Sequence, residues 1–157
     1  MSKFAANYVL SGKGDFLKNG IVITGNDGNV SEYVDTRGDL DEIAQLSFHN
    51  GIMLAGFTFL KTSVEIHVSE TDLPIRSYIF HIIKELNQLS VPQWIEIAKQ
   101  VQEQFPSMKI PEIIQQLNEV LITNGGFVKE DAPGIYLINA NLVEMHFTAK
   151  SRLKKIG

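Results

Sequence analysis

The chain has 157 residues, of which 44% are hydrophobic, and its formal net charge at pH 7 is −4. This length and apolar content predict a compact folded protein with a sizeable core, and the negative charge argues against nucleic acid or a membrane as the main partner. The sequence contains no cysteine, which excludes disulfides, cysteine-ligated metals and a thiol nucleophile. No apolar run reaches 18 residues and the N-terminus lacks an apolar signal core, so we expect a cytoplasmic protein.

The first part of the chain predicts short strands joined by tight turns. Residues Phe4 to Leu10 and Ile21 to Thr24 are rich in side chains that favour strands. The run Asn26-Asp27-Gly28-Asn29 contains the Asp-Gly pair that is typical of a two-residue hairpin loop. Val30 to Val34 is therefore the expected returning strand.

Further strands are expected towards the middle of the chain. Two short strands are predicted between Ile43 and Leu54, one on each side of Asn50-Gly51, because this dipeptide favours a turn. From Phe57 to Val68, apolar and polar residues alternate. Such alternation is typical of a half-buried strand.

Three helices are predicted after Asp72, each with a proline near its start. Pro74 falls in the first turn of one, and the others begin around Pro92 and Pro111. Apolar residues recur at helical spacing in each segment. The first of these stripes is Ile75, Ile79, Ile82, Ile83 and Leu86.

The last part of the chain returns to strand patterns, in the segments Phe127-Val128, Ile135 to Ile138, Leu142 to Phe147 and Arg152 to Ile156. Short N-terminal strands cannot bury an inner face alone, and these C-terminal strands bring matching apolar residues. We therefore predict an α+β fold. Residues 1–66 and 126–157 form a composite, β-sandwich-like domain, and residues 67–125 form an inserted three-helix lobe.

The segment from Phe48 through Asn50-Gly51 to Gly56-Phe57 resembles the start of the barrel in metal-dependent amidohydrolases of the cytosine-deaminase and chlorohydrolase type. In that family the segment leads into a His-x-His pair of metal ligands, and those two positions fall on Lys61 and Ser63 here. A lysine ammonium has no lone pair to donate, and a serine hydroxyl is a poor ligand for zinc or iron. The resemblance therefore implies a relative without its metal site.

The same resemblance extends over Tyr8 to Gly28, over Leu89 to Leu117 and over Gly126 to Ile156, in the order found in the family. These stretches are similar to the small β-domain of the family and to the helices that close its barrel. A complete (β/α)₈ barrel takes about 250 residues. The resemblance thus implies a truncated relative that lacks a complete TIM barrel.

Only one set of residues is a candidate for metal chemistry. Glu65 and His67 share one face of a predicted strand, and Asp72 lies in a Thr-Asp pair similar to the one that holds the metal-bound aspartate of the family. One carboxylate without imidazole partners does not hold a catalytic zinc ion. We therefore expect no catalytic residues, no cofactor and no bound metal, and structural or surface roles for His49, His81 and His146.

These observations favour a non-catalytic amidohydrolase-like remnant that acts as a binding or scaffold protein. One alternative is a residual metal-dependent hydrolase or deaminase that acts on a C–N bond of a small molecule through Glu65, His67 and Asp72. A further alternative is a winged-helix-like protein-interaction module, with residues 111–124 as its recognition helix. Glu112 and Glu119 on that helix would repel DNA. Pairing of the strands after Gly126 with the N-terminal strands would distinguish a composite domain from a wing.

Loss of a barrel would leave apolar surface where the barrel would have packed. We expect this surface around Phe57, Phe59, Trp94 and Met108. Exposed apolar patches are commonly covered by self-association or by a partner. A homodimer, or a complex with another protein, is therefore predicted.

Overall fold

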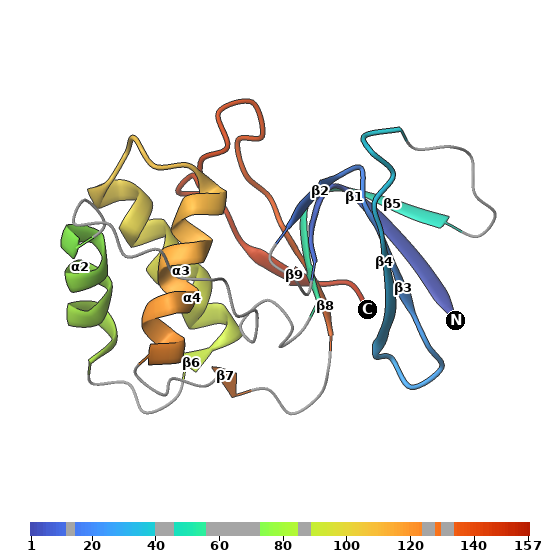
Figure 1. The fold of residues 1–157 in the computed structure, drawn as a ribbon, viewed down its shortest axis with the longest axis horizontal. Coiled ribbons are helices and arrows are strands. Elements are labelled where there is room, and N and C mark those ends of the chain that lie inside the picture. The colour runs from blue at the N-terminus through green and yellow to red at the C-terminus, as the bar shows by residue number, and fades with distance from the viewer. Residues whose placement is uncertain (12–14, 40–45, 56–72, 85–88, 124–127, 130–133) are drawn as a thin grey trace.

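The computed structural model describes residues 1–11, 15–39, 46–55, 73–84, 89–123, 128–129 and 134–157. The predicted order of strands, helices and strands is confirmed (Figure 1). Its elements are β1 (Ser2–Leu10), β2 (Phe16–Lys18), β3 (Ile21–Thr24), β4 (Val30–Val34), β5 (Leu46–Ala55), α2 (Leu73–Ile83), β6 (Leu89–Ser90), α3 (Val91–Gln104), α4 (Ile110–Thr123), β7 (Val128–Lys129), β8 (Ile135–Ile138) and β9 (Leu153–Lys155).

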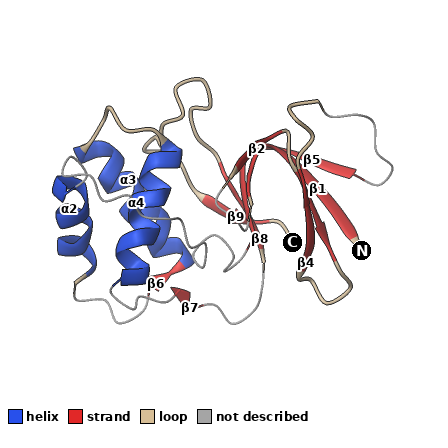
Figure 2. Cartoon of the chain, in the orientation of Figure 1, coloured by secondary structure: helices blue, strands red, loops and turns tan. Residues whose placement is uncertain are grey.

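One sheet combines strands from both ends of the chain, in the order β4-β3-β1-β5-β8-β9, with β2 paired to β1 beside β3. Strands β1 and β5 run parallel, and β5 pairs antiparallel with β8 from Ile52↔Ile138 to Ala55↔Ile135. The predicted α+β class with a composite sheet is therefore confirmed, and the described strands form an open sheet that does not close into a barrel. Figure 2 shows the sheet on one side of the molecule and the helices on the other, with β8 and β9 nearest the helices.

The strand that follows the helical lobe does not form the wing of a winged helix. Strand β8 pairs with β5 from the N-terminal half, and the short strand β7 pairs in parallel with β6. Within the described residues, β7 and β8 are not neighbours in a common hairpin. The pairing of β8 with β5 is therefore the one expected for a composite sheet built from both ends of the chain.

Each face of the sheet packs an apolar cluster, because successive side chains of a strand point to opposite faces. Ile52 and Leu54 of β5 face the helices, where they pack with Ile79, Ala98 and Leu117 of the helical lobe. Met53, between them, packs on the other face with Val9 and Val22. The helix-side cluster is the larger of the two, and it joins the lobe to the sheet.

The expectation of two short strands around Asn50-Gly51 is wrong, because these residues form a bulge within one strand, β5. β5 is one continuous strand, but its register with β1 shifts so that Asn50 and Gly51 lie opposite the single residue Asn7. The Gly51 N–H donates to the Asn7 side-chain oxygen at 2.7 Å, and the φ angle of Gly51 is 135°. The extra residue of a bulge commonly needs such a glycine.

The hairpin between β3 and β4 is present, but its loop differs from the predicted two-residue loop. Gly25 donates its N–H to the Asn29 carbonyl at 2.9 Å, which leaves three residues in the loop, and of these Gly28 has a positive φ of 80°. This is the common three-residue hairpin, in which a glycine follows a tight turn. The side-chain amide and backbone N–H of Asn29 both donate to Asp27 and lower the pKa of that carboxyl group.

The expected strand from Leu142 to Phe147 is also wrong. Residues 142–145 form a turn, closed by reciprocal backbone hydrogen bonds between Asn141 and His146 of 3.0 and 3.1 Å. The Asn141 side-chain oxygen accepts the N–H groups of Val143 and Glu144. An asparagine that satisfies nearby backbone donors in this way stabilises a turn at the expense of a strand.

All three predicted helices are present, and their buried residues match the predicted stripes. Ile75, Ile79 and Ile83 of α2 are buried. Trp94 is completely buried in α3, and Met108 is half-buried in the loop after it, so neither belongs to the expected exposed patch. Phe57 and Phe59 lie outside the described residues. Among the described residues, no helix is long and apolar enough to cross a membrane.

Candidate functional site

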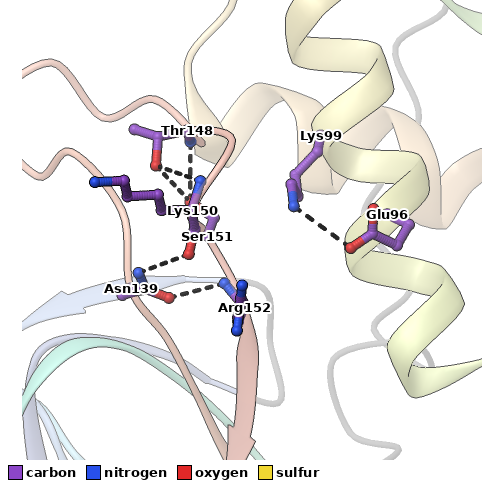
Figure 3. A network of polar contacts seen from close by, with 7 residues as sticks. All are labelled: Glu96, Lys99, Asn139, Thr148, Lys150, Ser151 and Arg152. Carbon is purple, nitrogen blue, oxygen red and sulfur yellow. Dashed lines mark hydrogen bonds and ion pairs between the residues drawn. The ribbon is translucent and has the colours of Figure 1, made fainter.

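The described part of the chain has a groove with a volume of about 530 Å³ between α3 and the segment 146–149. Helix α3 forms one wall and the segment leading to β9 forms the other, so the groove lies where the helical lobe meets the sheet (Figure 3). Its walls combine charged, polar and apolar side chains. They are Glu96, Lys99, Gln100, Gln102, Glu103, Pro106, His146, Phe147, Thr148 and Ala149.

Gln102 ties the two walls of the groove together. Its side-chain nitrogen donates to the carbonyl oxygens of Met108 at 2.6 Å and Phe105 at 3.4 Å, beyond the end of α3. Its side-chain oxygen accepts the Phe147 N–H at 3.2 Å from the opposite wall. Both ends of this buried amide are therefore occupied by backbone groups, and the Phe147 segment is held at a fixed distance from α3.

A second set of hydrogen bonds fixes the shape of the opposite wall. The Ser151 hydroxyl oxygen, which is fully buried, accepts the Thr148 N–H at 2.9 Å, and the Lys150 N–H donates to the Thr148 hydroxyl at 3.3 Å. Asn139 holds this turn to the sheet, because its amide donates to the Lys150 carbonyl and its oxygen accepts the Arg152 N–H (Figure 3). The polar side chains behind the groove thus serve to order the backbone.

The charges around the groove are of both signs. Lys99 lies 3.4 Å from Glu96 across one turn of α3, and His146 Nδ1 lies 3.7 Å from a carboxylate oxygen of Glu144. Glu96 and Glu144 are largely exposed. Such pairs contribute little to stability, but they remain available to charged groups of a ligand.

The predicted candidates for metal binding cannot be placed at this groove. Glu65, His67 and Asp72 lie outside the described residues, as do Lys61 and Ser63. Within the described residues, no group of three or more histidine, aspartate or glutamate side chains could hold a metal ion.

The three histidines in the described part of the chain lie in different environments. The His49 ring lies 6.2 Å from the Phe4 ring on the sheet, and His81 is exposed on α2. His146 lines the groove, although its sequence context indicated only a structural or surface role. The sequence carries no local signal for this position, because the groove joins residues about 45 positions apart in the chain.

A scan against protein-family models, a search of curated proteins and a search of solved structures gave no significant match.

Replacement of Gln102 by methionine tests the tie between the two walls. Methionine has a similar length but leaves the Met108 carbonyl and the Phe147 N–H without their partner, so we expect a loss of about 2 kcal/mol in the free energy of unfolding. Urea denaturation measures this loss. The control is Gln100→Met on the exposed side of the same helix, which should change stability by less than about 0.5 kcal/mol. Equal effects of the two variants would contradict the proposed tie.

Proposed function

We propose that this protein is a non-catalytic binding or scaffold protein of the cytoplasm, derived from an amidohydrolase-like ancestor, and that the groove beside α3 receives a segment of a protein partner. The observation that supports this proposal most directly is the ordered groove. One wall is a helix, the other is a turn fixed by Gln102, Ser151 and Asn139. A site that is ordered before binding loses little entropy when its ligand arrives.

The composition of the walls fits a polypeptide segment better than a reacting small molecule. Pro106, Phe147 and Ala149 offer apolar contacts, while Lys99 and Glu103 offer charges of both signs. The Thr148 hydroxyl is engaged with Ser151 and Lys150 in the turn. A mixed surface of this kind suits an apolar anchor residue flanked by polar groups.

A substitution that fills the groove tests the proposal. Ala149 is exposed in the turn, so Ala149→Trp should occupy the groove without disturbing the core. Both proteins are immobilised on beads and exposed to native cell extract. We expect Ala149→Trp to bind the partner at least about tenfold more weakly than the unaltered protein does, which corresponds to a loss of about 1.4 kcal/mol in binding free energy.

The matched control is Val143→Trp, which adds the same side chain at a position that is 94% exposed and is not among the residues lining the groove. It should retain the partner. Retention of the same proteins by both variants would show that the groove is not the binding site. A co-purified nucleobase or amine bound near Glu65 and His67 would instead support the hydrolase alternative.

A further inference from the structure

One part of β5 has an open edge. β5 pairs with β1 from Leu46 to Leu54, but β8 covers its other side only from Ile52 to Ala55. No described strand pairs with Leu46–Asn50 on that second side. Ser47, Phe48 and Asn50 are exposed, and Phe48 is 44% exposed despite its size. The segment Leu46–Asn50 is called the open edge below.

The open edge lacks the charged side chains and prolines that oppose strand addition, and the bulge of β5 begins only at its last residue, Asn50. Natural sheets protect their edges with charged side chains, prolines or bulges. The other strands at the borders of this sheet follow that rule, since β4 carries Glu32, β2 carries Lys18, and β9 carries Lys154 and Lys155. The open edge has the sequence Leu-Ser-Phe-His-Asn, with no acidic residue, lysine, arginine or proline.

We propose that the open edge is the contact surface of a homodimer, in which two copies of this chain pair antiparallel about Phe48 and join their sheets. In that register Phe48 lies opposite Phe48 of the second copy, and Ser47 lies opposite His49. Aromatic residues that face each other across antiparallel strands stabilise the pair. A twofold arrangement of this kind closes on itself, and it covers the open edge of both copies.

A second copy fits this edge better than a charged peptide does. Each chain carries a formal net charge of −4, so two copies approach most easily through a surface without charged groups, and the open edge is such a surface. The register also leaves no lysine, arginine or acidic side chain opposed across the contact. The proposal does not depend on the groove, which lies at α3.

The mass of the protein in solution tests the proposal. Light scattering coupled to size exclusion should give twice the 17.6 kDa of one chain at micromolar concentration and above. Phe48→Lys should return the mass to that of one chain, because a lysine on an edge opposes strand addition. Phe80→Lys is the matched control, since Phe80 is 47% exposed but lies on α2, and it should leave the dimer intact.

Several outcomes would overturn the proposal. One is a single-chain mass for the unaltered protein across the concentration range, and another is a dimer that persists in Phe48→Lys. A monomer in which the amides of the open edge that point away from β1 are nevertheless protected from hydrogen exchange would show that another segment of the same chain covers the edge.

Cysteine cross-linking tests the register, because the chain has no cysteine of its own. Antiparallel partners lie about 4.5–5.5 Å apart between Cα atoms, which a disulfide can span. Phe48→Cys should therefore form a covalent dimer on mild oxidation, whereas Ser77→Cys on the exposed face of α2 should not. Cross-linking at comparable rates in both variants would contradict the register.

Discussion

Replacement of Gly51 by alanine is expected to cause the largest loss of stability among single substitutions of the sheet. A Cβ atom at this position would lie 2.5 Å from the Ile138 carbonyl oxygen, and that oxygen belongs to the backbone of β8. The φ angle of 135° is also one that residues other than glycine rarely adopt. We expect the clash and the backbone strain together to cost about 4 kcal/mol or more in the free energy of unfolding, measured by urea denaturation.

Gly28 provides the control for this experiment. Its φ of 80° also favours glycine, but nothing lies within 4 Å of a Cβ atom built there. Gly28→Ala should therefore show the backbone cost alone, about 1 kcal/mol. If Gly51→Ala were no worse than Gly28→Ala, the close packing of β8 on the bulge would not contribute to stability as the structure indicates.

The sequence predicted the elements whose signals are local. The prolines at positions 74, 92 and 111 and the apolar stripes behind them marked the three helices, and short runs of strand-favouring residues bounded by turn signals marked most of the sheet. Matching apolar residues at both ends of the chain also indicated one composite sheet. These predictions held because propensity, capping and burial all favoured the same structure.

The predictions were wrong at two kinds of position. In one, a residue packs against a segment that is distant in sequence. In the other, a side chain accepts hydrogen bonds from nearby backbone N–H groups. The dipeptide Asn50-Gly51 favours a turn by its sequence, but in the structure the glycine is needed because β8 passes close to it. The Asn141 side chain accepts the Val143 N–H and so stabilises a turn where a strand is predicted. The groove could not be predicted at all, because Gln102 meets Phe147 only after the lobe has packed on the sheet.

Replacement of Arg76 by methionine is expected to destabilise the helical lobe by about 3 kcal/mol, because it removes one partner of a buried ion pair. The Arg76 guanidinium bonds to the Glu119 carboxylate and donates to Gln116 at 2.8 Å, which links α2 to α4. The Glu119 side chain is only 3% exposed. Without the guanidinium, the Glu119 carboxylate stays buried but loses the cation of this pair, which helps to offset the cost of taking its charge out of water.

Lys99→Met separates this effect from the loss of a surface charge, since Lys99 pairs with Glu96, which is 62% exposed to water. We expect that variant to lose less than about 1 kcal/mol. The double variant Arg76→Met with Glu119→Leu should recover most of the stability lost in Arg76→Met, because the buried carboxylate is then removed together with its cation. Urea denaturation of these three variants and of Glu119→Leu alone would decide the matter. If the double variant were as unstable as the sum of its single substitutions, the Arg76 side chain would stabilise the lobe by its packing, and the ion pair would contribute nothing of its own.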